Sequence, residues 1–179
     1  MSRPTRSDAR RNAELLRVAA LRVFMSRGID APLDDVAREA GVSIGTLYNH
    51  FGNRDRLIDD ILPGAAAAQL ARIRIAAETT DDPRERVERY LHEVFAVQAS
   101  DRLLSDALAT LPSLPADAAR TCQEVIGLGR RLIADARDHG ASPLLDEDTL
   151  VALILANSTV QRGGSPKDWD RLLITLARA

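Results

Sequence analysis

The sequence predicts an all-α protein, and three observations support that fold class. Alanine and leucine are abundant, whereas aromatic residues make up only 3% of the 179 residues, and this composition favours helices over strands. Apolar residues recur every three or four positions along most of the chain, which is the period of one helix face. No segment shows the alternation typical of a half-buried strand. The spacing and the helix-breaking residues between segments together indicate about nine helices.

A short arm and three helices are predicted in the N-terminal third. Residues 1–9 are polar and contain a proline, so we expect a flexible arm. The helices that follow are expected at 10–27, 33–40 and 44–51. Gly28 stops the first, and Pro32 opens the second because proline suits a helix start. Ser43 is expected to cap the third, since its hydroxyl can accept a hydrogen bond from a first-turn N–H.

Further helices are predicted in the remaining two thirds. Their expected starts lie near residues 54, 81, 101, 116, 146 or 148, and 168. Pro63 and Gly64 interrupt the first of these helices. Because proline lacks an N–H and clashes with the preceding turn, we expect a kink or break there that serves as a pivot. The predicted domains are a helix-turn-helix domain over 1–53 and a helical body over 54–179.

The distribution of charge suggests that the N-terminal end meets an anion. The net charge is −2, but the first 27 residues hold seven arginines and only two acids. A basic start on a neutral-to-acidic body is typical of a chain that contacts an anion at one end. For the first four of these arginines, a solvated tail and a DNA-contacting arm are equally compatible with the sequence.

Cysteine content and hydropathy indicate the compartment. Cys122 is the only cysteine, so no intramolecular disulfide can form and a cytoplasmic location is expected. No window holds the ~18 consecutive apolar residues of a membrane span, and no apolar run follows the charged start, so we expect neither a membrane segment nor a signal peptide.

The stretch from Leu33 to Leu57 carries the strongest functional signal. Its two short helices are joined by a tight turn, and Gly41 can adopt the positive φ that such a turn needs. Four apolar residues are spaced to bury one face between the helices: Val36, Val42, Leu47 and Phe51. The opposite face of the second of these helices is compact and mostly polar: Ile44, Gly45, Thr46, Tyr48, Asn49 and His50. A face of this kind fits the major groove of DNA.

This stretch resembles the DNA-binding region of the TetR (tetracycline-repressor) family of regulators. The resemblance covers roughly residues 10–60 and rests on five motifs in register: Val36-Ala37, Gly41-Val42-Ser43, Gly45-Thr46-Leu47-Tyr48, His50-Phe51 and Asn53-Arg54. The sequence departs from the family pattern at Pro32-Leu33, where the family often has a capping Thr or Ser, and at Ile44, where a polar residue is more usual.

The resemblance implies a DNA-contacting role for each matching residue. Base edges would be faced by Ile44, Gly45 and Asn49, and phosphates would be contacted by Thr46, Tyr48 and His50, with Ser43 at the start of the same helix. Arg54 stands where the family often has a phosphate-binding lysine. Hydroxyl, imidazole and guanidinium groups all donate to phosphate oxygens, and Ile44 could contact only an apolar group such as a thymine methyl.

The resemblance also implies a homodimer and a small-molecule pocket, with repression of a palindromic operator relieved by the ligand. The last two predicted helices would pack against the partner through two apolar stripes. The stripes are Leu150, Leu153, Ile154 and Asn157, and Trp169, Leu172, Leu173 and Leu176. On a monomer, stripes of this length would be exposed, which is a usual mark of an interface.

The expected pocket lies in the helical body and is mostly aliphatic. Its predicted lining is Phe95, Gln98, Leu108, Cys122, Ile126 and Gly129, which suits a small, largely apolar effector. For Gln98, a helix end reaching water and a hydrogen bond to the ligand both remain open. For Gly129, close packing and room for a ligand remain open, and Cys122 is expected to be a small core residue rather than a redox sensor.

An enzyme is not expected. The sequence has no nucleophile elbow, no glycine-rich phosphate loop and no paired acids beside a histidine. His92 and His139 have no ligand-spaced partner, so no metal site is expected, and no cofactor is implied. A DNA-binding regulator whose body answers to a partner protein, or to nothing, is the alternative to a ligand-controlled repressor.

Overall fold

The computed structural model describes residues 6–109, 115–140 and 146–163, together with Trp169, Arg171 and Thr175. In these residues the chain forms eight helices and no strand, which confirms the all-α prediction. The helices are α1 (Arg6–Arg27), α2 (Leu33–Glu39), α3 (Ile44–Phe51), α4 (Arg54–Ala77), α5 (Pro83–Ser100), α6 (Arg102–Ala109), α7 (Ala116–Asp138) and α8 (Glu147–Gly163).

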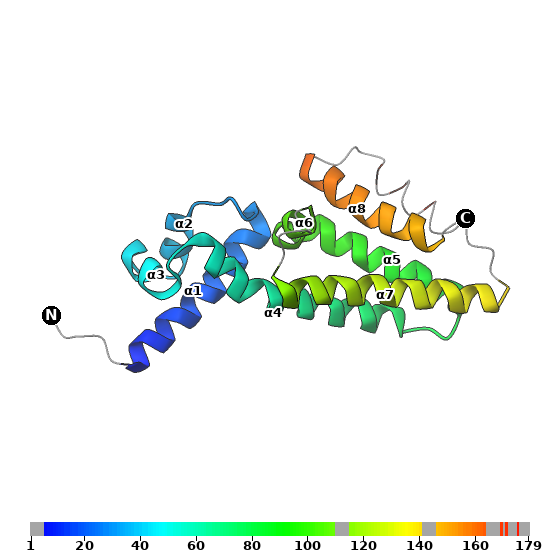
Figure 1. Ribbon diagram of the computed structural model, residues 1–179, viewed down its shortest axis with the longest axis horizontal. Helices are drawn as coiled ribbons and strands as arrows, with labels where there is room; N and C mark the ends of the chain where they lie inside the picture. Colours follow the sequence, from blue (N-terminus) through cyan, green and yellow to red (C-terminus); the bar gives the residue numbers. More distant parts are fainter. Residues whose placement is uncertain are drawn as a thin grey trace.

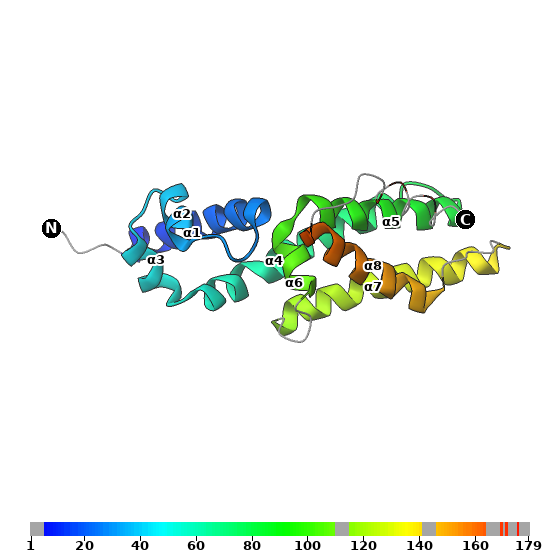
Figure 2. The same cartoon turned by 90° about the horizontal axis from the view of Figure 1, so that it is seen from above.

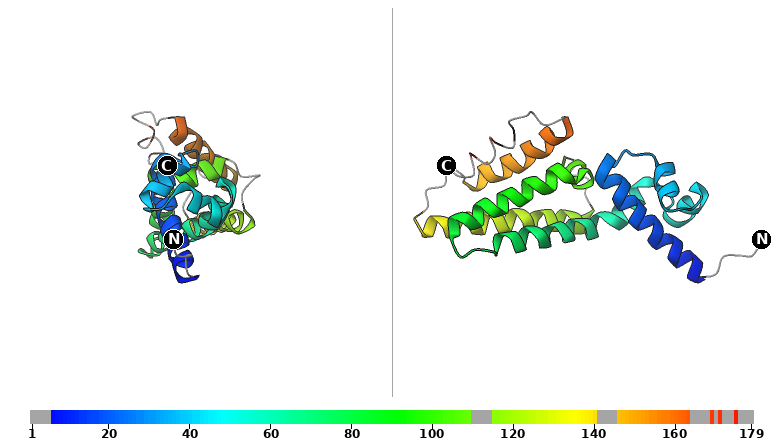
Figure 3. Two further views of the ribbon diagram at one scale, coloured as in Figure 1. Left: turned by 90° about the vertical axis from the view of Figure 1, so that its left-hand side faces the viewer. Right: turned by 180° about the vertical axis from the view of Figure 1, so that it is seen from behind.

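The helices form an elongated molecule with a small N-terminal end and a larger body. Figure 1 shows α1, α2 and α3 grouped at one end, with α4 running from this group into the body. In the body, α4, α5 and α7 pack along one another. The last helix, α8, lies across α5 and α7, as Figure 2 shows from above. The views in Figure 3 place α8 on the outer side of the body, with its far face uncovered by the other described helices.

Short-range hydrogen bonds explain where several helices begin. The Ser43 hydroxyl accepts from the Thr46 N–H at 3.2 Å, which caps α3 as predicted. The Asn53 side chain accepts from the Arg56 N–H at 2.9 Å and caps α4. Asp82 caps α5 in the same way, directly before the proline that opens that helix.

Two boundaries differ from the sequence prediction. The first helix begins at Arg6 rather than near residue 10, so the last four residues of the expected flexible arm belong to α1. The fourth helix runs unbroken from Arg54 to Ala77 with Pro63 inside it, so the expected break is wrong. A proline removes only one hydrogen bond of the helix ladder, and the buried residues on both sides of Pro63 hold this helix against α1 and α5.

The prediction for the C-terminal stripes also needs correction. Leu150, Ile154 and Asn157 are buried inside the chain, because they face α5, α6 and α7 rather than a partner. The outward face of α8 carries Ala152, Leu155, Ala156 and Thr159, all exposed. In the second stripe, Trp169 is half-buried, while Leu172, Leu173 and Leu176 lie outside the described residues, as does most of the expected ninth helix.

One continuous core joins the small end to the body. Phe24 in α1, Leu47 in α3 and Leu57 in α4 are fully buried in it, as is Leu103 in α6. The N-terminal half of α4 therefore packs with the small end, although the helix continues into the body. None of the described helices is long and apolar enough to cross a membrane.

Gly129 in α7 lies directly against α5 and α8. A Cβ at this position would lie 2.6 Å from the Tyr90 hydroxyl oxygen and 2.7 Å from a Leu150 methyl carbon. Both neighbours are buried and cannot move aside easily. Two residues earlier in the same helix, a Cβ on Gly127 would meet only the end of the flexible Arg131 side chain, at 3.5 Å.

These two glycines make a matched pair for thermal unfolding. We expect Gly129→Ala to lower the free energy of unfolding by about 1–3 kcal/mol, because overpacking forces buried side chains from their positions. Gly127→Ala should raise it by about 0.5–1 kcal/mol through helix propensity alone. Equal effects of the two substitutions on thermal unfolding would contradict the packing described here.

Candidate nucleic-acid interface and ligand cavity

The α2 and α3 helices pack at a tight turn with the geometry expected of a helix-turn-helix. Val36 and Leu47 are fully buried between them. Gly41 has φ of +67°, a conformation that glycine adopts without strain. The Val42 N–H donates to the Ala37 carbonyl at 3.0 Å and closes the turn. The orientation of α3 is therefore fixed by its own turn as well as by the core.

The outward face of α3 presents most of the predicted DNA-contacting residues together. Tyr48 is 49% exposed, and Gly45 and Asn49 beside it are exposed as well. His50 is half-buried, with its ring centre 6.3 Å from that of Phe51. The Thr46 and Ser43 hydroxyl oxygens lie 2.9 Å apart at the start of the helix. The face thus offers hydroxyl, amide and imidazole groups within two helical turns.

Two of the predicted residues are placed differently from the rest. Ile44 is half-buried and packs against the core, so only part of its side chain is open to a base edge. Arg54 turns away from the α3 face: its Nη1 donates to the Ala31 carbonyl at 2.7 Å and to the Ile29 carbonyl. Both acceptors lie in the loop between α1 and α2.

Ion pairs connect the helices around this face. The Arg17 Nε donates to Asp60 at 2.6 Å and joins α1 to α4, and this hydrogen bond raises the pKa of Arg17. Asp35 in α2 pairs with both Arg27 and Arg38. Desolvation opposes ionisation of Asp35, but the hydrogen bonds from these two arginines outweigh it and hold the pKa of Asp35 below its ordinary value. The sequence showed Arg17 and Arg27 only as positive charge, because the acidic partners Asp60 and Asp35 lie on other helices.

An apolar cavity of about 80 Å³ lies in the body between α4, α5, α7 and α8. Its walls are formed largely by aliphatic side chains, among them Leu70, Ile73, Val94, Val97, Ile154 and Leu155. Of the predicted lining, Gln98, Cys122 and Ile126 border this cavity. Burial raises the pKa of the Cys122 thiol, so the thiol stays protonated and unreactive.

The other predicted pocket residues do not border the cavity or are not described. Phe95 is buried in the core, and Gly129 is packed against Tyr90 and Leu150, so close packing accounts for this glycine. The side chain of Leu108 lies outside the described residues. The walls contributed by α4 and α8 were not predicted, although the apolar spacing of Leu70 and Ile73 on one face of α4 was a usable signal.

Comparisons with known proteins agree with this geometry. Residues 16–61 match the family model described as bacterial regulatory proteins, tetR family. The transcriptional repressor KstR2 of Mycobacterium tuberculosis is 37% identical over 79 residues, which cover 44% of this chain and 39% of the repressor. The regulator TtgR of Pseudomonas putida is 29% identical over 178 residues, or 95% of this chain and 76% of that regulator.

A solved structure extends the likeness to the body. The regulator FadR from Bacillus subtilis, in complex with stearoyl-CoA, aligns with a TM-score of 0.64 and 15% identity over 92% of this chain and 95% of that chain. The family match itself covers the DNA-binding end, residues 16–61. The likeness in fold extends through the body, whereas the match to KstR2 spans only about two fifths of that repressor's length.

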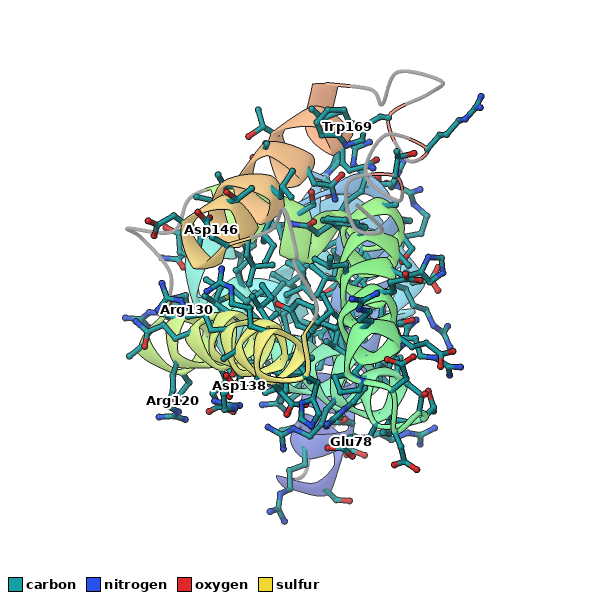
Figure 4. All side chains as sticks on the ribbon, turned by 90° about the vertical axis from the view of Figure 1, so that its right-hand side faces the viewer. Glu78, Arg120, Arg130, Asp138, Asp146 and Trp169 are labelled. Carbon is teal, nitrogen blue, oxygen red and sulfur yellow. The ribbon has the colours of Figure 1, made fainter. Side chains whose placement is uncertain are left out.

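The Gln98 side chain forms its hydrogen bonds within the protein. Its Nε2 donates to the Ile154 carbonyl at 2.9 Å, and its Oε1 accepts from the Asn157 Nδ2 at 2.6 Å. The Trp169 Nε1 donates to the Asn157 Oδ1 at 2.7 Å. Figure 4 shows Trp169 beside α8. Gln98 thus attaches α8 to α5 from inside, and neither of the two sequence-based alternatives for it describes this role.

Proposed function

We propose that this chain is a dimeric transcriptional regulator, a repressor that binds a palindromic operator through α3. The observation that carries the proposal is the exposed face of α3, which is formed by Gly45, Tyr48 and Asn49. The cap at the start of this helix and the tight turn before it fix its orientation. A face of this size enters the major groove, and the hydroxyl and imidazole groups at its edges donate to phosphates. Such a regulator acts where the chromosome is, in the cytoplasm. The repressor function of KstR2 supports the direction of control.

Replacement of Tyr48 by alanine tests the assigned face. The side chain is half exposed, so its loss should leave folding intact. We expect Tyr48→Ala to weaken binding of all duplexes by about tenfold, since loss of one phosphate contact acts on every sequence alike. Ile75→Ala, at a 64% exposed position in the body, is the matched control and should bind like the parent. Fluorescence anisotropy at several salt concentrations gives both results, and parental affinity for Tyr48→Ala would exclude the assignment.

The proposal includes an effector that is small and largely apolar. The polar side chains that border the cavity already have partners: Gln98 on α8, Gln69 on Asp101 at 3.3 Å, and Thr121 on the Asp117 carbonyl at 3.1 Å. An occupant would therefore be held mainly by contact with aliphatic walls. FadR of Bacillus subtilis holds stearoyl-CoA, and that example supports an effector with an alkyl portion.

Filling the cavity tests this part of the proposal. With 1-octanol as the probe, we expect the parent and Cys122→Ala to gain thermal stability with rising concentration, as binding to the native state requires. Cys122→Phe places an aromatic ring in the cavity and should lose the gain while remaining folded. If the body is regulated by a partner protein, or by no effector, none of the three proteins should gain thermal stability with 1-octanol.

A further inference from the structure

Arg54 is held inside the DNA-binding end by three contacts. The residue opens α4, directly after the turn that follows α3. Its Nη1 donates to the Ala31 carbonyl at 2.7 Å and to the Ile29 carbonyl. Its guanidinium carbon lies 5.8 Å from the centre of the Phe24 ring, which is fully buried. An Nη group carries two protons, so both protons of Nη1 are used by the loop between α1 and α2.

The same loop is held from its other side by the body of the protein. The Ile29 N–H donates to the Asp106 Oδ2 at 3.1 Å, and Asp106 belongs to α6. The loop over 28–32 is therefore fixed through its carbonyls by α4 and through an N–H by α6. Since α3 lies between α2 and α4 in the chain, the Arg54 contact sets the position of the C-terminal end of α3 relative to α2.

A phosphate contact through Nη1 would require Arg54 to give up these contacts, and only the Nε and Nη2 protons remain for another acceptor. Release of Nη1 would leave two part-buried carbonyls without their donor, and an unpaired buried acceptor is costly. The guanidinium also lies over the Phe24 ring, and a lysine ammonium lacks the planar, forked geometry of a guanidinium. Arg56, in the same first turn of α4, is exposed and needs no such release to approach a phosphate.

We propose that Arg54 is a positioning residue, which holds the recognition helix in register with the base edges by fastening the α1–α2 loop, and is not a phosphate ligand. The proposal rests on the DNA-binding function proposed above. If Arg54 is a positioning residue, its loss should reduce discrimination between DNA sequences and should leave the number of neutralised phosphates unchanged.

The experiment compares Arg54→Gln, Arg54→Lys and Arg56→Gln with the parent protein. Duplexes selected from random DNA and a scrambled duplex of equal length are titrated by anisotropy over a range of salt concentrations. Circular dichroism at the assay temperature confirms folding, and Arg54→Lys serves where Arg54→Gln does not fold. Arg56→Gln removes an exposed cation from the same helical turn without touching the loop.

We expect both Arg54 variants to bind the selected duplex at least about tenfold more weakly, because they lose one or both of the charge-assisted hydrogen bonds to the loop. Their affinity for the scrambled duplex should change less than about twofold, and the salt slope should be that of the parent, because no phosphate contact is lost. Arg56→Gln should keep the ratio of the two affinities.

A fall in the salt slope of about 0.9 for Arg54→Gln, with full affinity restored in Arg54→Lys, would identify a phosphate ligand and overturn the proposal. Unchanged discrimination in both Arg54 variants would overturn it as well. If the parent binds no duplex at all, the proposed function itself fails, and this outcome is distinct from the other two.

Discussion

Ala156→Arg is expected to convert the protein to monomers and to weaken operator binding at least a hundredfold. Ala156 is exposed on the outward face of α8, together with Ala152 and Thr159. We propose this face as the dimer interface, because its small side chains would allow a second helix to approach closely. An arginine here is solvated in a single chain, but a packed dimer would bury its charge, and an unpaired buried charge costs about 3–5 kcal/mol.

The control for this prediction is Ala68→Arg. Ala68 is exposed on α4, so the same substitution adds the same charge to a helix surface that is not assigned to the interface. Sedimentation velocity at micromolar concentration should show a dimer for the parent and for Ala68→Arg, and a monomer for Ala156→Arg. A dimeric Ala156→Arg with parental operator affinity would place the interface elsewhere, and a monomeric parent would contradict the dimer itself.

Gly28→Ala is expected to lower the free energy of unfolding by about 3 kcal/mol. Gly28 ends α1 with φ of +86°, and an added Cβ would collide with the Asp106 carboxylate. A left-handed alanine costs about 1–2 kcal/mol. The collision would also displace the carboxylate from the Ile29 N–H, and loss of a hydrogen bond to a charged group costs about 1.5–3 kcal/mol.

Gly41→Ala separates the two parts of that cost. Gly41 has φ of +67°, and a Cβ there would meet no atom within 4 Å, so only the backbone penalty of about 1–2 kcal/mol applies. Addition of Asp106→Ala to Gly28→Ala should remove the collision, so that the double variant is more stable than the sum of the single effects predicts. Thermal unfolding of the parent, the two glycine variants, Asp106→Ala alone and the double variant measures this. Equal losses for Gly28→Ala and Gly41→Ala would contradict the described contact with α6.

Local rules made the recognition face predictable from the sequence. The cap at Ser43 depends on a hydrogen bond over three residues, and the buried and exposed faces of α3 follow from helical periodicity. Gly41 marked the turn because few other residues adopt its conformation. For these features, the information lies within one or two turns of chain.

The features that the sequence did not reveal depend on partners far apart in the chain. Gln98 meets Asn157 across 59 positions, and the Ile29 N–H meets Asp106 across 77. Arg54 resembled a phosphate ligand in sequence, but the loop carbonyls that it contacts are identified only once α1 and α4 are packed together. Periodicity indicates that a residue faces inward, but it does not indicate which polar group lies opposite.

Selection of bound duplexes from random DNA, followed by footprinting, tests the central claim most directly. A dimer that presents two copies of α3 should select a pseudo-palindrome whose half-site centres lie about 34–36 Å apart, or close to a multiple of that distance. Protection should cover both half-sites, and Asn49→Ala should change the preferred bases while leaving the spacing unchanged. Failure to enrich any sequence, or enrichment of a single asymmetric site bound by one chain, would contradict the account.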